Sequence, residues 1–204
     1  MPMATIYCTA TSLDGYIADD DESLSWLFAT SGEAEPAGYT PTDPDPSLPD
    51  LHFDRFYADV GSIVCGVNTF EWVRRDLTRD GQPFAWPYTV PSWVVTHRDL
   101  APVDGVEFFS GDVTDLHPLL TEAADGKDVW IVGGGDLAGQ FTDHGLLDRV
   151  WIHQCPVVLG PGRPLLPRRL RLHRQKIETH GQFTAMLFDV VGREPRDPSK
   201  DRSG

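Results

Sequence analysis

Seven short runs of apolar residues, rich in β-branched and aromatic side chains, divide the chain, and their spacing leaves few folds open. Gly, Pro or Asp bounds most of these runs, and helix-like spacing of apolar residues falls between several of them. Strands that alternate with helices favour an α/β sheet with helices on both faces. The predicted strands are 4–10, 61–66, 92–96, 105–110, 128–132, 149–158 and 182–191.

Apolar residues at i, i+3, i+4 and i+7 predict four helices between the strands. These helices are 51–59, 69–78, 114–125 and 136–143. Asn68 and Glu71 resemble a capping box at the second of them. No clear helix separates 149–158 from 182–191, so we expect these two strands to pair antiparallel and to make the sheet mixed.

The length of 204 residues fits one domain, which we place at residues 1–191. Within it, residues 29–50 are crowded with Pro, Gly, Asp and Thr and show no periodicity. A loop insertion of this length is usually functional or disordered. The polar end, 192–204, is predicted to be a flexible tail.

Charge and cysteine usage narrow the functional classes. A formal net charge of −14 argues against nucleic acid and anionic membranes as partners. No apolar run approaches the roughly 20 residues of a membrane span. Cys8, Cys65 and Cys155 lie in apolar runs without metal-ligand spacing, which favours reduced thiols, no metal site and a cytoplasmic protein.

Two predicted strands run directly into helices: SIVCGVNTFEWV at 62–73 and VWIVGGGDLAGQF at 129–141. A helix start offers unpaired backbone N–H groups and the positive end of the helix dipole, which suit a phosphate. Glycine lets an anion approach the backbone, although a tight turn also uses glycine for geometry alone. The spacing does not match G-x-G-x-x-G, so a Rossmann dehydrogenase is disfavoured.

Five segments in order resemble the dihydrofolate reductase superfamily, and within it the branch that contains the reductase domain of the riboflavin-biosynthesis deaminase/reductase. They are TATSLDGYIAD (9–19), GVNTFEWV (66–73), VVTHRDL (94–100), VWIVGGGDLAGQF (129–141) and LLDRVWIHQCPVVLGPGRPLL (146–166). The resemblance covers about residues 4 to 190. It implies one dihydrofolate reductase-like α/β domain, with a mixed, mostly parallel sheet flanked by helices, that binds NADPH in extended form.

The resemblance also implies roles for individual residues, which fall into three groups along the cofactor. The phosphate group is Gly66, Val67, Asn68, Thr69, Gly133, Gly134, Gly135, Asp136 and Leu137; the adenosine group is Thr96, His97 and Arg98; the nicotinamide group is Gly15, Ile17 and Ala18. The family often has a cis peptide between the first two glycines of the run, so we expect one at Gly133–Gly134. Alternatively, Arg98 is an ordinary exposed arginine of a loop.

Two positions depart from the pattern of the relatives. Related sequences commonly carry a basic residue for the 2′-phosphate where this chain has Val67, so NADH remains an alternative to NADPH. The riboflavin-pathway reductase typically has a glutamate where this chain has Val132. A small heterocycle of pterin, pyrimidine or related imine type is therefore expected as substrate, rather than one particular pyrimidine.

Two aspartates are the candidates for the catalytic acid, which would supply or relay a proton. Asp14, in SLDG, faces the active-site cleft in the family, but Asp-Gly is also a common turn pair. Asp50 opens the helix before the strand 61–66, where bacterial dihydrofolate reductases have their acid, but a helix N-cap is an equally simple role. Asp54, one turn later, is a weaker alternative.

The sequence thus predicts an NADPH-dependent reductase of the dihydrofolate reductase or riboflavin-pathway type. The alternative is a non-catalytic nucleotide-binding or dimeric interaction protein that keeps the fold, and Val67 and Val132 favour it. A flavin or deazaflavin in the nicotinamide cleft also stays open. Relatives in this branch are commonly homodimers, so a homodimer is expected.

Overall fold

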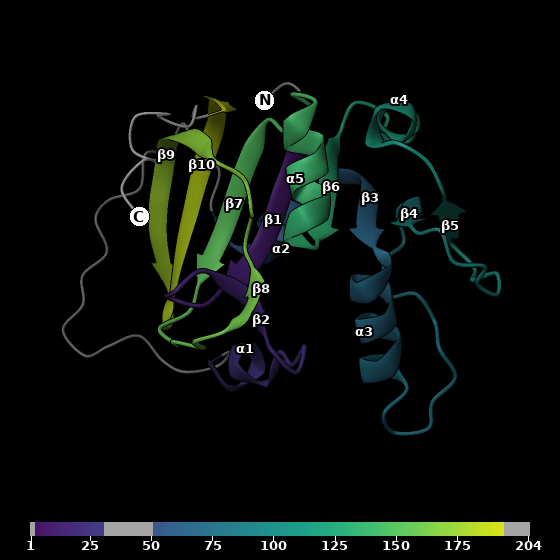
Figure 1. The fold of residues 1–204 in the computed structure, drawn as a ribbon, viewed down its shortest axis with the longest axis horizontal. Coiled ribbons are helices and arrows are strands. Elements are labelled where there is room, and N and C mark those ends of the chain that lie inside the picture. The colour runs from purple at the N-terminus through teal and green to yellow at the C-terminus, as the bar shows by residue number, and fades with distance from the viewer. Residues whose placement is uncertain (1–2, 31–50, 194–204) are drawn as a thin grey trace, which may run out of the picture.

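The computed structural model describes residues 3–30 and 51–193, and in this part of the chain an eight-stranded sheet dominates. Its strand order is β5-β4-β3-β6-β1-β7-β10-β9, and β2 and β8 form a separate pair (Figure 1). The strands are β1 (Thr5–Thr11), β2 (Tyr16–Asp19), β3 (Val60–Gly66), β4 (Ser92–Val95), β5 (Val106–Phe109), β6 (Asp128–Gly133), β7 (Arg149–Gln154), β8 (Gly162–Pro164), β9 (Leu170–His180) and β10 (Phe183–Arg193). The helices are α1 (Ser25–Thr30), α2 (Phe53–Ala58), α3 (Val67–Leu77), α4 (Val113–Ala123) and α5 (Gly135–Asp143).

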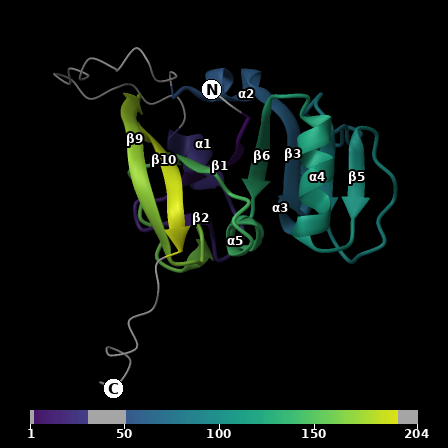
Figure 2. The same ribbon diagram turned by 90° about the horizontal axis from the view of Figure 1, so that it is seen from above.

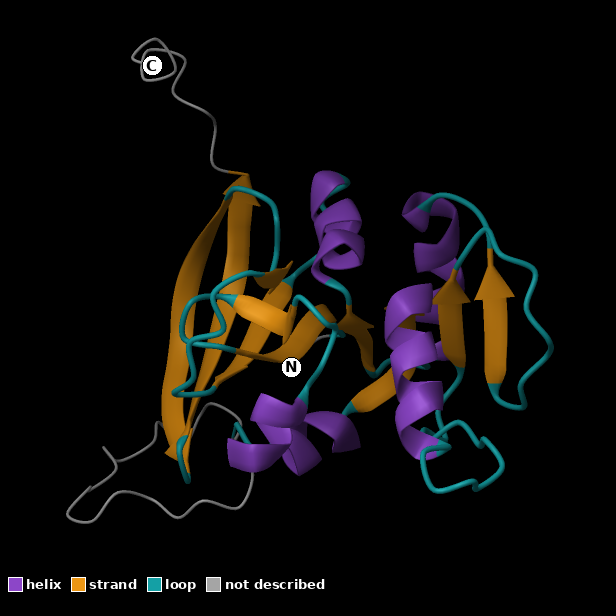
Figure 3. Ribbon diagram, turned by 60° about the horizontal axis from the view of Figure 1, so that its bottom comes forward, coloured by secondary structure: helices purple, strands orange, loops and turns teal. Residues whose placement is uncertain are grey.

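The sheet is mixed, as the sequence predicts. The six strands from β5 to β7 are parallel to their neighbours, whereas β10 pairs antiparallel with β7 and β9 antiparallel with β10. The expected antiparallel pairing of the last two predicted strands is therefore confirmed. The long β9–β10 hairpin forms the edge of the sheet opposite β5 (Figure 3).

Helices cover both faces of the sheet because alternate strand residues point to opposite sides. On β6, Val129 and Ile131 pack with the apolar stripes of α4 and α5, while Trp130 between them packs with Phe56 of α2. Phe70 of α3 packs on Cys65 and other residues of the α2 side of the sheet. Figure 2 shows α2 and α5 on opposite sides of the sheet.

Several predicted boundaries differ from the structure. Helix α3 begins at Val67 with Gly66 as its N-cap, so the prediction of a capping box formed by Asn68 and Glu71 is wrong. Strand β7 ends at Gln154, where the chain turns toward the loop before β8. The structure adds α1, β2, β8 and β9, which the sequence did not predict.

The two special segments are only partly described. Ala29 and Thr30, assigned to the loop insertion 29–50, belong to α1, and residues 31–50 lie outside the described part of the chain. Gly192 and Arg193, assigned to the tail 192–204, end β10, and the rest of that tail also lies outside. No helix in residues 3–30 and 51–193 combines the length and the apolar character that crossing a membrane needs.

The parallel strands all point their carboxyl ends toward one edge of the sheet. There α3 leaves β3, and α1 and the β2–β8 pair lie beyond β1 and β7 (Figure 1). Ligands of open α/β sheets bind in the crevice outside the carboxyl ends of the strands. A ligand site is therefore expected at this edge.

Candidate active site

A cleft of about 950 Å³ opens at this edge, and its lining includes residues of β1, β2, β3, β6 and β7 and of the helix starts that follow β3 and β6. One end of the cleft is built from the starts of α3 and α5. The other end is built from aromatic rings and histidines. The two ends suit different ligands.

The starts of α3 and α5 meet each other directly. Their N-cap residues are Gly66 and Gly134, so no capping side chain occupies the first amides of either helix. A methyl group at Gly66 would lie 3.8 Å from the Gly134 amide nitrogen. Two sets of free N–H groups, each at the positive end of a helix dipole, thus converge on one place. This arrangement suits the diphosphate of a dinucleotide.

The three consecutive glycines have different physical roles. A β-carbon at Gly135 would overlap the carbonyl oxygens of Pro164 and Leu165, so this glycine lets β8 pass close to α5. At Gly133 it would lie 3.2 Å from Thr69 Oγ1, a tight contact. At Gly134 it would meet only the Ile17 Cδ1 atom, at 4.0 Å. Only Gly134 leaves open space toward the cleft, and the peptide Gly133–Gly134 is cis, as expected.

The cleft brings together most of the predicted cofactor residues. Its lining includes the whole phosphate group, and also Ile17 and Ala18 from the nicotinamide group. Gly15 is not part of the lining. It has a φ of +87° in the turn after β1, and its carbonyl accepts a hydrogen bond from Leu165 N.

The predicted adenosine group lies beside this end rather than in it. Thr96 follows β4, whose last residue Val95 pairs with Gly66 and lines the cleft. The Thr96 hydroxyl accepts from the Arg98 amide at 3.0 Å, and His97 Nδ1 lies 2.9 Å from Ser110 Oγ. The Arg98 side chain is exposed and is not among the lining residues of the cleft. Thr96 thus shapes the loop that carries Arg98.

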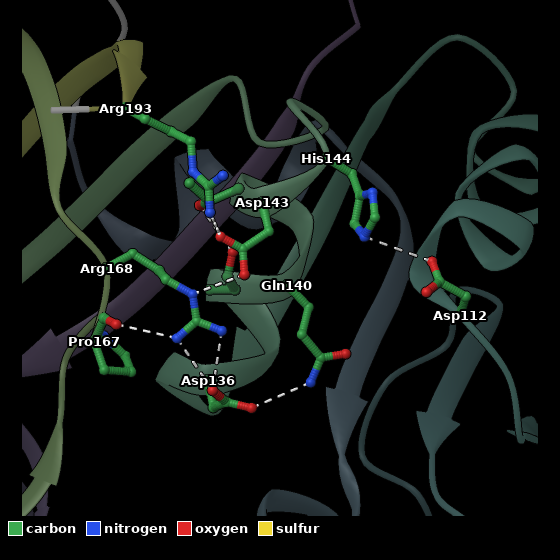
Figure 4. A network of polar contacts seen from close by, with 10 residues as sticks. Asp112, Asp136, Gln140, Asp143, His144, Pro167, Arg168 and Arg193 are labelled. Atoms are coloured by element: carbon green, nitrogen blue, oxygen red, sulfur yellow. Dashed lines mark hydrogen bonds and ion pairs between the residues drawn. The ribbon is translucent and has the colours of Figure 1, made fainter. Parts of the chain in front are cut away.

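A network of charged side chains holds α5 (Figure 4). The Arg168 guanidinium donates to Asp143 at 2.8 Å and lies 3.3 Å from Asp136 Oδ1, and Gln140 donates to the other Asp136 oxygen at 3.1 Å. Arg193 also pairs with Asp143. The hydrogen bond from Arg168 is the main reason that the pKa of Asp143 is lowered. Arg168 therefore balances a carboxylate, Asp136, in the first turn of a helix whose start would receive phosphate.

Asp14 and Asp54 are not among the described lining residues of the cleft. Asp14 accepts hydrogen bonds from Ser12 Oγ at 2.6 Å, Leu159 N at 3.1 Å and Gly160 N at 2.8 Å. These donors, Ser12 first, lower its pKa. Through these hydrogen bonds Asp14 fixes the loop before β8. An ionised carboxylate that already accepts three hydrogen bonds is a poor proton donor. Asp54 is exposed on α2, and Asp50 lies outside the described residues.

Sequence reasoning missed the aromatic wall at the other end of the cleft. Trp130 of β6 forms edge contacts with Phe53 and Tyr88, with centroids 5.4 and 5.2 Å apart, and all three line the cleft. Trp130 Nε1 donates to Cys8 O at 2.9 Å, which fixes the indole. Burial raises the pKa of Tyr88 to about 12, so its hydroxyl stays neutral. Such a wall suits a planar ring.

Sequence reasoning also missed three histidines that gather beside this wall. His52 precedes α2, His153 lies on β7 and His180 ends β9, and all three line the cleft. The rings of His52 and His180 are 3.7 Å apart. No sequence spacing connects positions 52, 153 and 180, and only the sheet order brings them together. None of the groups of His, Cys, Asp and Glu in residues 3–30 and 51–193 is arranged to hold a metal ion.

The mixed sheet, the paired helix starts and the cleft at the strand ends define a dihydrofolate reductase-like α/β domain of the riboflavin-reductase type. The RibD C-terminal domain model matches residues 4–185, and the chain belongs to this family. The chain is 30% identical over 192 residues to the uncharacterized protein YwjB of Bacillus subtilis (strain 168), covering 92% of this chain and 98% of that protein.

Solved structures agree with this assignment. A Shewanella sp. PV-4 protein that carries a riboflavin-biosynthesis name is 29% identical, with a TM-score of 0.69 over 92% of this chain and 99% of that one. The Thermotoga maritima diaminohydroxyphosphoribosylaminopyrimidine deaminase/5-amino-6-(5-phosphoribosylamino)uracil reductase shares the fold, with a TM-score of 0.57 and 16% identity. That likeness covers 93% of this chain and 57% of the Thermotoga protein.

Proposed function

We propose that this protein is an NADPH-dependent reductase that transfers hydride to a small heterocyclic substrate. The observation that carries the proposal is the meeting of two uncapped helix starts, at Gly66 and Gly134, at one end of a cleft whose other end is aromatic. A dinucleotide and a planar substrate could share this cleft end to end. The family assignment supports the same reaction class.

The residues present fit the cofactor. Gly134 leaves open the space that a side chain would fill, and the amides of Gly66–Thr69 and Gly133–Leu137 would hold the diphosphate. Ile17 and Ala18 would form the surface under the nicotinamide. Arg98, exposed past β4, would meet the 2′-phosphate of NADPH, the contact that distinguishes it from NADH. When bound, the reduced nicotinamide supplies the hydride.

The chain's own groups would then orient the substrate and control the proton. The carboxylates among the described lining residues are Glu22, which pairs with Arg163 at 2.6 Å, and Asp136, which pairs with Arg168. Because both carboxylates are paired with an arginine, we propose that a water molecule in the cleft, rather than a carboxylic acid, delivers the proton that follows hydride transfer.

A single titration and a single assay test the proposal. Calorimetry should detect binding of NADPH, and the near-ultraviolet absorbance of the reduced nicotinamide should fall when pterin or pyrimidine substrates are added. Nucleotide binding without turnover across a broad panel would favour the second candidate, a non-catalytic nucleotide-binding protein. The absence of Asp14 from the described lining of the cleft is the observation that favours this candidate.

A further inference from the structure

The aromatic end of the cleft contains a buried polar atom with no partner. His153 lines the cleft from β7, and its Nε2 atom is buried without a hydrogen bond to any described residue. Buried polar groups are normally hydrogen-bonded, and an exception in a ligand-sized cavity needs an explanation. A ligand that accepts from or donates to Nε2 would supply one.

The two residues that flank His153 in the sheet are small. In the sheet register His153 lies between Ala10 of β1 and Ala185 of β10, and neither methyl group is large enough to cover an imidazole. Phe53, which is 42% exposed, also lines the cleft and packs on the buried Trp130, so its ring offers an apolar surface to a planar ligand. The site thus combines a stacking wall with a hydrogen-bonding edge.

Among the described lining residues, no Lys or Arg without an acidic partner lies at this end. Arg163 is the only Lys or Arg among the described lining residues, and Glu22 engages its guanidinium at 2.6 Å. Lys176 is buried nearby on β9 but pairs with Glu178 at 2.5 Å. His180 has the same Glu178 carboxylate 3.4 Å from its Nε2, so a proton there would be balanced at once. Residues 31–50 contain no Lys or Arg in their sequence.

The charge of His153 follows from the same surroundings. Burial, and then the neighbouring His180 and His52, lower the pKa of His153 to about 4. The imidazole is therefore neutral at pH 7 and acts as a hydrogen-bonding group rather than as a cation. A phosphate dianion placed at this end would lose its hydration without gaining a counter-charge, which is strongly unfavourable.

We propose that the aromatic end binds an uncharged, planar nitrogen heterocycle that carries no phosphate group, and that His153 Nε2 hydrogen-bonds to its edge while the exposed ring of Phe53 packs against it. The inference rests on the proposed function, since it assigns the substrate class of the same cleft. It separates this site from one made for a sugar-phosphate substrate. His153 is a substrate-binding residue in this assignment.

Matched probes that differ only in phosphate test the substrate class. Calorimetry at pH 7 would compare 6-hydroxymethylpterin with its monophosphate ester, and uridine with uridine 5′-monophosphate, on the full chain with and without NADPH. We expect at least one unphosphorylated member to bind, about tenfold or more tightly than its phosphate. Equal or tighter binding of the phosphates, or no binding of either unphosphorylated probe, would overturn the proposal.

Variants test the role of His153. His153→Ala should weaken binding of the preferred probe about three- to tenfold, and His153→Gln, which keeps an N–H donor, should restore part of it. His173→Ala changes an exposed histidine of β9 outside the cleft lining and should have no effect. Unchanged affinity in His153→Ala would remove His153 from the site. If the probe binds but NADPH does not, the proposed reductase function is refuted and this inference stands. If NADPH binds but no probe does, this inference is refuted and the proposed function stands.

Discussion

Gly135 lies against Leu165 so closely that a side chain at position 135 would overlap the Leu165 carbonyl. This contact joins the start of α5 to the chain that leaves β8, and the same segment is held from the other side by the hydrogen bond from Leu165 N to Gly15 O. The glycine run is thus partly a packing device and partly a ligand site. Gly135 serves the packing of α5, whereas Gly134 leaves space for a ligand.

Gly135→Ala is expected to destabilise the fold, whereas Gly66→Ala is expected to spare it. The first forces apart two backbones and should cost about 1–3 kcal/mol of unfolding free energy or more. The second places a methyl group 3.8 Å from Gly134 N, an ordinary contact, and should change stability by less than about 1 kcal/mol. Denaturant unfolding measures both. Calorimetry should show that Gly66→Ala nonetheless weakens NADPH binding; unchanged binding would place the diphosphate elsewhere.

Asp14→Asn is expected to lower stability while leaving turnover at saturating substrate largely intact. Because the folded pKa of Asp14 is lowered, its contribution to stability is present above its ordinary pKa of 3.8 and is lost as the pH falls through the folded value. The variant should therefore show a weaker loss of stability on acidification below about pH 4. Unfolding curves over this pH range measure the effect.

The control for Asp14 is Asp104→Asn, an exposed aspartate in the turn before β5. It should change neither stability nor rate. If instead Asp14→Asn removed turnover and left the unfolding curve unchanged, the carboxylate would regain the role of catalytic acid.

Much of the fold was predictable because its signals are local. Continuous apolar strands such as β3 and β6 running into helices gave the parallel sheet and both helix starts. Strand β9 was missed because its sequence, LRLHRQKIETH, is highly charged; an edge strand with an exposed face needs few apolar residues. The hydrogen bonds of Asp14 with Leu159 and Gly160 could not be predicted, because these partners are distant in sequence.

One end of the candidate site could be predicted from the sequence, and the other could not. The phosphate end follows from two strand-to-helix junctions, which are visible in the sequence at 66–69 and 133–137. The histidine end depends on the pairing of β7 with β10 and of β10 with β9, which brings His153 near His180. Long-range pairing of this kind leaves no periodic signal along the chain.

Arg98→Ala is expected to weaken NADPH binding about five- to tenfold and to leave NADH binding unchanged, because only NADPH carries the 2′-phosphate that an arginine would pair with. Arg98 is exposed, so solvent screening keeps the effect modest. Calorimetry with both nucleotides at two salt concentrations measures it. Arg79→Ala, which changes an exposed arginine just after α3, is the matched control. An unchanged preference for NADPH would remove Arg98 from the cofactor site.

Arg168→Ala is expected to weaken nucleotide binding as well as stability. Without the guanidinium, the Asp136 carboxylate in the first turn of α5 keeps only the Gln140 contact, and its charge opposes an incoming phosphate. The lost pairing with Asp143 should cost about 1 kcal/mol of unfolding free energy. The double variant Arg168→Ala/Asp136→Asn removes the opposing charge, so it should recover nucleotide affinity without recovering stability. Recovery of both, or of neither, would show that Arg168 acts on the nucleotide end only through the packing of α5, not through charge.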